Sequence, residues 1–316
     1  MSDQTAGRTR AGFVAIVGAP NAGKSTLVNA LVGSKVSIVS PKVQTTRMRV
    51  IGIAMADLPG ESGAEGERAQ VVLVDTPGIF RIAKRRLERA MVAAAWQGAE
   101  DADVVALVID AERGVGEETR AIIERLKESK APRYLVLNKI DLVPREKLLT
   151  LTAEVNALLP FESVFMVSAL KNDGVADILK TVAARLPAGP FLYPEDQAAD
   201  LPLRLLAAEV TREQVFLQLH QELPYEAAVE TEKWEERKDG GVRIEQTIHV
   251  QREGQRAIVL GKGGAKIKQI GARARHELGQ MLERPVHLFL HVKVSERWAE
   301  DPSHYRTIGL DFEPKK

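Results

Sequence analysis

Four residues near the N-terminus have the types and spacing needed to hold a chain of phosphates. Gly18, Gly23, Lys24 and Ser25 fit G-x-x-x-x-G-K-[ST] in the stretch IVGAPNAGKST, which follows an apolar run and opens a helical one. The glycines permit backbone angles that other residues avoid, so the loop amides can converge on phosphate oxygens. Lys24 would neutralise the β- and γ-phosphates, and the Ser25 hydroxyl would ligate Mg²⁺. The pattern predicts a nucleoside triphosphate site, completed by Ala19, Pro20, Asn21, Ala22 and Thr26.

A second short motif would select the base. Asn138, Lys139 and Asp141 form N-K-x-D at the end of a predicted strand, the edge at which open α/β sheets bind ligands. The Asp141 carboxylate can accept hydrogen bonds from N1–H and the 2-amino group of guanine, whereas adenine lacks that amino group and presents an acceptor at N1. An unpaired buried acceptor costs about 1–3 kcal/mol, so guanine is predicted over adenine. The backbone of Ser168, Ala169 and Leu170 is expected to contact the guanine O6.

Two further segments are predicted to complete the metal and γ-phosphate site. Asp75 ends the apolar run of VVLVDTPGIF and would hold Mg²⁺ through water, while the Gly78 amide would meet the γ-phosphate. Thr46, in QTTRM, would add its hydroxyl to the Mg²⁺ shell only when a triphosphate is bound. The predicted metal ligands are Ser25, Thr46 and Asp75, and Thr76 and Pro77 are placed in the nucleotide site beside Gly78.

A glycine-rich turn nearer the C-terminus indicates single-stranded nucleic acid. Gly261, Lys262, Gly263 and Gly264 form G-x-x-G between two predicted helices, so that a phosphate backbone can pack directly on main chain. From Arg243 to Arg275 there are eight basic residues and only two acidic ones, a stripe typical of phosphate binding. The predicted RNA contacts are Arg256, Gly261, Lys262, Gly263, Gly264, Lys266 and Lys268, beside an apolar groove of Ile258, Val259, Ile267 and Ile270.

The elements that must position the nucleotide motifs alternate along residues 13–186. Six β-branched runs are separated by segments of helical period, and several runs are apolar throughout, as in strands covered on both faces. This alternation predicts an α/β domain with a mainly parallel sheet and helices on both faces. Residues 56–70, rich in Gly and Glu, are interpreted as an exposed hairpin loop.

The chain is predicted to contain two domains. Residues 186–202 include four prolines and are interpreted as a linker. The predicted boundaries are 10–186 for the nucleotide-binding domain, 187–202 for the linker, 203–300 for an α+β domain of order α-β-β-α-α-β, and 301–316 for a C-terminal tail.

The composition excludes several kinds of site and segment. The 316 residues include no cysteine, which excludes disulfides, thiolate metal sites and cysteine nucleophiles. The polar start is expected not to be a secretory signal, and no apolar run approaches the roughly 18 residues of a membrane span. The formal net charge is only +1, so the basic stripe is a local feature.

With its motifs in this order, the chain resembles the bacterial Era-type GTPases. The nucleotide motifs are similar to those of Era/TrmE-type P-loop GTP-binding domains, and the G-x-x-G turn with PVHLFLHVKV and a W-A-x-D tail is similar to a type-2 KH domain. The resemblance covers about residues 10–312. It implies GTP/GDP and Mg²⁺ as cofactors, and a molecular switch whose loops near 35–50 and 76–95 are ordered by the γ-phosphate.

The same resemblance implies a partner. A monomer would bind 16S ribosomal RNA near its 3′ end and assist assembly of the small (30S) ribosomal subunit in the cytoplasm, with peripheral association with the inner face of the membrane. One alternative is an RNA-modifying enzyme controlled by GTP, but the C-terminal domain offers no catalytic residues for it. The other alternative is a membrane-associated signalling GTPase with an incidental KH fold.

Hydrolysis is expected to be slow and stimulated by a partner or by K⁺. Ile79 and Phe80 follow Gly78 where other GTPases carry a water-orienting glutamine. Members of the resembled class with an asparagine at the position of Asn21 can use K⁺ beside the phosphates, but Asn21 could equally only hydrogen-bond its own loop. The predicted catalytic residues are Lys24, Asn21, Thr46 and Gly78, whereas Arg47 and Arg49 are interpreted as solvated.

Overall fold

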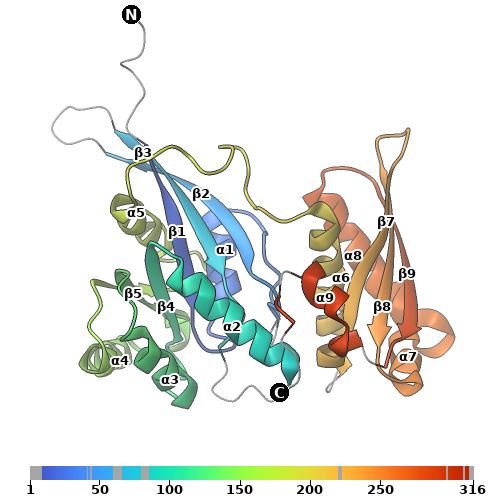
Figure 1. Cartoon of the computed structure of the whole chain (residues 1–316), viewed down its shortest axis with the longest axis horizontal. Coiled ribbons are helices and arrows are strands. Elements are labelled where there is room, and N and C mark those ends of the chain that lie inside the picture. The colour runs from blue at the N-terminus through green and yellow to red at the C-terminus, as the bar shows by residue number, and fades with distance from the viewer. Residues whose placement is uncertain are drawn as a thin grey trace, which may run out of the picture. The chain divides into compact units, whose positions relative to one another are not determined.

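A computed structural model describes residues 9–40, 42, 45–59, 66–79, 85–219, 223–296, 298–308 and 310–312 (Figure 1). Its contacts divide the chain into two compact units, and the division between Asp200 and Leu201 falls inside the predicted linker. Residues Ile38–Thr45 group with the C-terminal unit although the sequence on both sides of them belongs to the N-terminal unit.

The first unit is built on a six-stranded sheet of order β2-β3-β1-β4-β5-β6. All neighbouring strands run parallel except β2 and β3, which form an antiparallel hairpin, so the predicted mainly parallel sheet is confirmed. The strands are β1 Thr9–Val17, β2 Val50–Leu58, β3 Glu67–Asp75, β4 Val104–Asp110, β5 Arg133–Asn138 and β6 Ser163–Val167. Because parallel strands end at the same edge, the segments that follow β1, β3, β5 and β6 meet there.

Helices cover both faces of this sheet, as the apolar runs predict. On one face, α1 and α5 pack against β1 and β3, with Leu27, Val28 and Ile178 in the shared core. On the other face, α2, α3 and α4 contribute Trp96 and Ile122 among others to a second core. The helices are α1 Lys24–Val32, α2 Arg86–Glu100, α3 Glu117–Leu126, α4 Arg145–Leu158 and α5 Val175–Arg185, with a 3-10 turn, η1, at Ile140–Leu142.

The β2–β3 hairpin is longer than predicted. Its pairing extends to Leu58 opposite Glu67, so residues 56–58 and 67–70 lie in strands, and Ala56, Ala69 and Gln70 are buried. The interpretation of the whole of 56–70 as an exposed loop is therefore wrong for these residues, because ladder pairing overrides their Gly- and Glu-rich context. Residues 60–65 of that prediction lie outside the described residues.

The proline-rich stretch is bound to the first unit over most of its length. Gln70 Oε1 accepts hydrogen bonds from the amides of Leu192 (2.8 Å) and Tyr193 (2.9 Å), and Gln70 Nε2 donates to Tyr193 O (2.8 Å). Further on, the Ile53 amide donates to Ala198 O (2.8 Å) at the outer edge of β2. These contacts tie the stretch to the sheet up to its last residues.

The second unit is an α+β fold with the predicted order α-β-β-α-α-β. Its three-stranded sheet has the order β7-β8-β9, with β7 and β8 antiparallel and β8 and β9 parallel. The strands are β7 Ala228–Glu236, β8 Val242–Val250 and β9 Val286–Val294, and the helices are α6 Leu203–Gln218, α7 Glu253–Leu260, α8 Ala265–Met281 and α9 Pro302–Thr307. Short 3-10 turns lie at Leu223–Glu226 (η2), Lys262–Gly264 (η3) and Trp298–Glu300 (η4).

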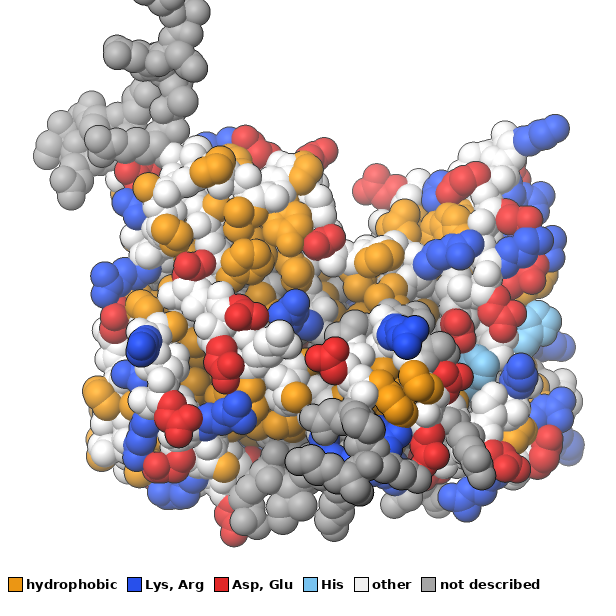
Figure 2. Space-filling model, in the orientation of Figure 1, with side chains coloured by type: hydrophobic (Ala, Val, Ile, Leu, Met, Phe, Trp, Pro, Cys, Tyr) orange, Lys and Arg blue, Asp and Glu red, His pale blue; other side chains and the backbone are white. Residues whose placement is uncertain are grey.

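The visible surface carries acidic and basic side chains that are interspersed rather than gathered into large fields of one sign (Figure 2), which agrees with the formal net charge of +1.

None of the helices in the described part of the chain has the length and apolar character that a membrane span requires.

Replacing Gln70 by leucine should destabilise the protein by about 2–3 kcal/mol, because each buried polar group that loses its partner costs about 1–3 kcal/mol. Urea denaturation of the full chain measures this change, with Gln97→Leu on the exposed side of α2 as the matched control. Equal, small effects of the two substitutions would show that the Gln70 side chain does not hold the proline-rich stretch.

Candidate functional site

The loop between β1 and α1 can be made only with glycine at two positions. A Cβ on Gly18 would lie 2.4 Å from the carbonyl oxygen of Val108, and one on Gly23 would lie 2.2 Å from Asn138 Nδ2. Gly23 also has a φ of 94°, in the left-handed region, where it caps the N-terminus of α1. The loop therefore packs closely against β4 and β5, with the positive end of the α1 dipole behind it.

Lys24 is buried at the first position of α1. Its Nζ donates to Gly18 O and Ala19 O, both at 3.0 Å, and so spans the loop that it follows. Burial lowers the pKa of Lys24 to about 8. A phosphate chain in the loop would supply the negative charge that favours the protonated amine, which is the partner this lysine needs.

The predicted metal ligands converge. The hydroxyl oxygens of Ser25 and Thr46 lie 2.8 Å apart, about the spacing of neighbouring ligands in an octahedral Mg²⁺ shell with bonds of about 2.1 Å. Asp75 is fully buried beside them, and burial raises the pKa of its carboxyl group. Its Oδ2 accepts from the Ser37 hydroxyl at 2.6 Å, while Oδ1 has no hydrogen-bond partner among the described residues. Two hydroxyls and a carboxylate oxygen are a donor set that fits Mg²⁺ and its bound water.

Asn29 is a positioning residue that the sequence did not reveal. From α1, its Oδ1 accepts hydrogen bonds from the amides of Val36 and Ser37, both at 2.9 Å, and its Nδ2 donates to Ser37 O at 2.7 Å. These three bonds hold the segment that carries Ser37 to Asp75. An isolated asparagine inside a helix has no distinguishing pattern, so only the structure could identify it.

Asn138 joins the two loops that would surround the base. Its Nδ2 donates to Ala22 O and its Oδ1 accepts from the Ala169 amide, both at 3.0 Å. Asp141 follows in η1, and hydrogen bonding to Ser168 lowers the pKa of its carboxyl group, helped by Lys171, whose Nζ lies 3.3 Å away. An ionised carboxylate is therefore available to accept from a guanine edge.

Lys139 supports the phosphate loop. It has a left-handed φ of 65°, and its Nζ donates to Asn21 O at 2.9 Å while pairing with Asp110 Oδ2 at 2.6 Å. Asp110, at the end of β4, is buried, and sequence reasoning missed it because only the tertiary fold brings it to Lys139. Asn21 itself has a left-handed φ of 63°, a conformation that asparagine adopts more readily than most residues.

The segment after β3 lies against the loop between β1 and α1. The Thr76 hydroxyl donates to Ile16 O at 2.7 Å, so the side chain of this residue joins β3 to β1. A Cβ on Gly78 would lie 3.0 Å from Pro20 Cα, which places Gly78 against the phosphate loop. Ile79 is buried, and its amide donates to Gly18 O at 3.3 Å; Phe80 lies outside the described residues.

Arg47 departs from the prediction. Its side chain is buried rather than solvated, as are Thr46 and Met48 on either side of it, whereas Arg49 is exposed as predicted.

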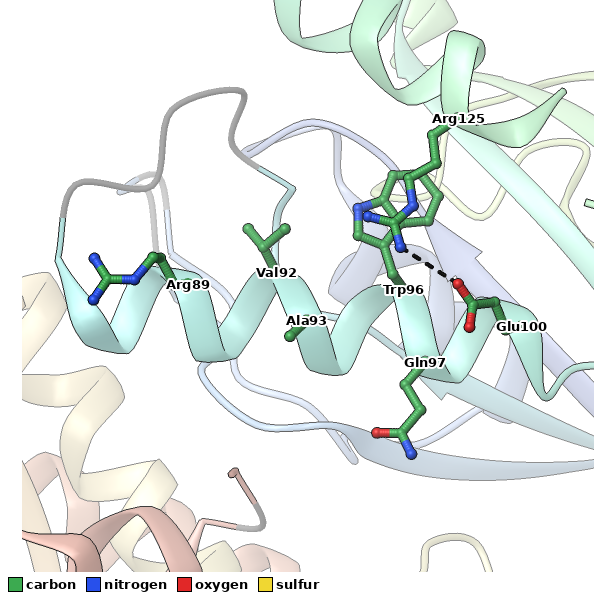
Figure 3. A pocket seen from close by; sticks show the side chains of 7 residues that line it. All are labelled: Arg89, Val92, Ala93, Trp96, Gln97, Glu100 and Arg125. Atoms are coloured by element: carbon green, nitrogen blue, oxygen red, sulfur yellow. Dashed lines mark hydrogen bonds and ion pairs between the residues drawn. The ribbon is translucent and has the colours of Figure 1, made fainter. Parts of the chain in front are cut away.

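The C-terminal half of α2 is held to α3 (Figure 3). The Arg125 guanidinium lies 4.4 Å from the ring centroid of Trp96, and its Nη2 is 3.3 Å from Glu100 Oε1. This cation–π contact and this ion pair both lie near the C-terminal end of α2. The earlier turns of the helix, which fall in the predicted switch loop 76–95, do not take part in these two contacts.

The glycine-rich turn of the second unit has the geometry that its composition predicts. Gly261, Gly263 and Gly264 have φ values of 69°, 60° and 77°, all in the left-handed region. A Cβ on Gly261 would lie 2.7 Å from Lys266 Cβ, so the turn follows the start of α8 closely. In the turn between α7 and α8, only Lys262 therefore carries a side chain.

The predicted RNA-contacting side chains surround this turn. Lys262 and Lys268 are exposed. Arg256 pairs with Glu253 at 3.3 Å, and Lys266 Nζ donates to Gln269 Oε1 at 3.2 Å, so both are held on their own helices.

A groove lies between α8 and the edge strand β9. The predicted apolar lining is only partly correct: Ile267 lines the groove and Ile258 is exposed, but Val259 and Ile270 are fully buried in the core. Helical spacing identifies an apolar stripe without saying which of its members face the sheet. The lining consists of Ile267, Lys268, Gly271, Ala272, Arg275, Leu288, Phe289 and Leu290.

Comparisons with known proteins agree with this geometry. Residues 13–139 match the family model described as 50S ribosome-binding GTPase, and residues 222–299 match the KH domain model. The chain is 58% identical to GTPase Era of Afipia carboxidovorans over 100% of this chain and 99% of that protein. It is also 58% identical to GTPase Era of Sinorhizobium medicae, over 96% of this chain and 94% of that protein.

The chain belongs to the GTPase Era family. Two solved Era structures share its architecture with a TM-score of 0.87, each covering 95% of this chain and 99% of the other. One is an Era variant from Aquifex aeolicus bound to GDP·AlF4⁻, 41% identical, and the other is an Era in complex with MgGDPNP and nucleotides 1506–1542 of 16S ribosomal RNA, 40% identical. The predicted P-loop GTPase domain followed by a KH domain is confirmed.

Alanine at Gly23 should weaken binding of guanine nucleotides by at least about 100-fold, because the new Cβ would displace Asn138 and so open both loops of the site. Gly33, the C-cap of the same helix, also has a positive φ, but a Cβ there would meet none of the described residues within 4 Å beyond its chain neighbours. Gly33→Ala should therefore cost about 1–2 kcal/mol of stability and leave nucleotide affinity unchanged. Titration with a fluorescent GDP measures both variants, and equal affinities would contradict the packing argument.

Proposed function

We propose that this protein is a GTP-hydrolysing switch that binds 16S ribosomal RNA near its 3′ end and assists assembly of the small ribosomal subunit. The observation that supports it most is that one chain carries both sites. A candidate guanine-nucleotide site with neighbouring Ser25 and Thr46 hydroxyls is followed by a G-x-x-G turn, in the same order as in the Era whose structure holds MgGDPNP and nucleotides 1506–1542 of 16S ribosomal RNA.

In this proposal the first unit binds the nucleotide through three sets of groups. Asp141 accepts from the guanine edge, Lys24 and the loop amides neutralise the phosphates, and Ser25, Thr46 and Asp75 hold the metal. Mg²⁺, when bound, withdraws charge from the β- and γ-phosphate oxygens. Hydrolysis transfers the γ-phosphoryl group to water and leaves GDP.

We propose catalytic roles for Lys24, Asn21, Thr46 and Gly78, and the positions of these residues around the phosphate loop support the proposal. Ile79 is buried and apolar, so it cannot orient the water, and we propose slow turnover that a partner or K⁺ stimulates. Lys139 holds the Asn21 backbone at the phosphate loop, and we expect the Asn21 side chain to ligate a monovalent cation beside the phosphates. Equal GTP turnover in K⁺ and Na⁺ would restrict Asn21 to shaping the loop.

The second unit would hold single-stranded RNA on the turn at Gly261–Gly264. The phosphate backbone would pack against glycine main chain, while Lys262, Lys266, Lys268 and Arg256 supply charge. Bases would lie in the groove beside Ile267 and the edge of β9. Work on the small subunit would place the protein in the cytoplasm, and peripheral contact with the inner face of the membrane stays a prediction.

Alanine at Gly261 should weaken binding of an RNA with the 3′-terminal sequence of 16S ribosomal RNA by at least about tenfold, because its Cβ would collide with Lys266 and lift the turn. Gly240, in the β7–β8 turn, also has a positive φ, 78°, but a Cβ there would point into open space among the described residues, so Gly240→Ala is the matched control. Fluorescence anisotropy of the labelled RNA measures both. If the wild type bound a scrambled RNA equally well, or if the two variants behaved alike, the proposed role of the turn would be wrong.

A further inference from the structure

A chain of side-chain hydrogen bonds runs from α1 to the carboxylate that would hold the metal. Asn29 holds the backbone of Ser37 at two points: its Oδ1 accepts from the Ser37 amide at 2.9 Å, and its Nδ2 donates to the Ser37 carbonyl oxygen at 2.7 Å. The Ser37 hydroxyl then donates to Asp75 Oδ2 at 2.6 Å. Asn29, Ser37 and Asp75 all belong to the first unit, so the whole chain of bonds lies within one compact part of the protein.

The bond from Ser37 sets a rotation of the Asp75 side chain that steric packing leaves loose. The Asp75 backbone is fixed, because β3 pairs there with β1 opposite Ile16 and with β2 opposite Val50. Rotation about the Cβ–Cγ bond of an aspartate is only weakly restricted, since torsions between sp³ and sp² atoms are broad. Ser37 is 4% exposed and Asp75 is 0% exposed, so bulk water does not compete for the bond that fixes this rotation.

The second carboxylate oxygen of Asp75 is the one that suits the metal site. Oδ1 is buried and has no hydrogen-bond partner among the residues that the structure describes. Buried polar atoms ordinarily have a partner, either in the protein or in bound water. In the proposed site, that partner is a water molecule on the Mg²⁺ ion that Ser25 and Thr46 would ligate.

Helix α1 carries residues that serve both parts of this arrangement. Ser25 and Asn29 are four residues apart, so their side chains leave the same face of the helix. Ser25 would reach the metal directly, whereas Asn29 reaches Asp75 through Ser37. We infer that Ser37 is a positioning residue for Mg²⁺, which turns Asp75 so that Oδ1 is offered to metal-bound water, and that Asn29 holds Ser37 in place for this role. The inference rests on the proposed function of the nucleotide site.

This role differs in its nucleotide dependence from that of Thr46. Ser37 lies at the start of the predicted first switch loop, but its backbone is held by α1, which also carries the phosphate-binding residues Lys24 and Ser25. Asp75 should therefore be held in the same way with GDP and with GTP. The Thr46 hydroxyl, by contrast, would join the metal only when a triphosphate is bound.

The test compares full-length Ser37→Ala with Ser34→Ala, which removes an exposed hydroxyl from the same connection after α1. Affinities for a fluorescent GDP and a fluorescent GDPNP are measured over a range of free Mg²⁺ concentrations and in EDTA. We expect Ser37→Ala to raise the half-saturating Mg²⁺ concentration about tenfold with both nucleotides, because residues that orient metal ligands typically change metal affinity about 10- to 100-fold. Nucleotide affinity in EDTA should be unchanged, and Ser34→Ala should behave as the wild type in every condition.

A double-mutant cycle decides whether Asn29 acts through Ser37. Asn29→Ala alone should also raise the Mg²⁺ requirement, but in a Ser37→Ala background it should raise it no further, because the hydroxyl that it positions is gone.

Four results would each overturn the inference: an unchanged Mg²⁺ requirement in Ser37→Ala, an equal loss of nucleotide affinity in EDTA, a shift confined to GDPNP, or an undiminished effect of Asn29→Ala in the Ser37→Ala background. The loss in EDTA would indicate a general structural role, and the shift confined to GDPNP would indicate an action through the switch loop. Failure of the wild type to prefer guanine over adenine nucleotides would instead refute the proposed function, so the two failures are distinguishable.

Discussion

The candidate site of the first unit depends on one contact, in which the Ser25 and Thr46 hydroxyls meet beside buried Asp75. The three residues come from the start of α1, from the switch segment and from the end of β3. They meet because parallel strands end at one edge of the sheet, so that each following segment starts in the same place. Gly18 and Gly23 pack closely against β4 and β5. Without this packing, the phosphate loop could not lie near enough to Thr46 and Asp75 for the three predicted ligands to hold one Mg²⁺.

The second unit uses glycine for a related reason and a different ligand. At the phosphate loop, the missing side chains let amides surround a compact, highly charged phosphate group. At Gly261–Gly264, where the glycines have left-handed φ values, the missing side chains would let an extended sugar–phosphate backbone pass across main chain. The Gln70 contacts that hold the proline-rich stretch leave little free chain before Leu201, so the segment that its prolines predict to be a linker is largely part of the first unit.

Most residues of the candidate nucleotide site could be predicted from short sequence motifs. Gly18 through Ser25 and Asn138 through Asp141 could be predicted because their chemistry depends on neighbours within a few residues, and the alternation of strands and helices placed them at one sheet edge. Asn29, Ser37 and Asp110 could not, since each is an ordinary polar residue whose role arises only when distant segments meet. Val259 and Ile270 were misassigned because period alone does not distinguish a groove from a core. The grouping of residues 38–45 with the second unit has no local pattern in the sequence.

A switch of this kind requires that the nucleotide held by the first unit governs RNA binding by the second. The affinity of the full chain for the 3′-terminal segment of 16S ribosomal RNA, titrated in parallel with Mg²⁺ and GDPNP or with Mg²⁺ and GDP, measures that coupling. We expect tighter binding with GDPNP by about fivefold or more, and by linkage an equal gain in GDPNP affinity relative to GDP when the RNA is present. Identical RNA affinities in the two nucleotide states would show that the two sites are not coupled and that the protein is not a switch.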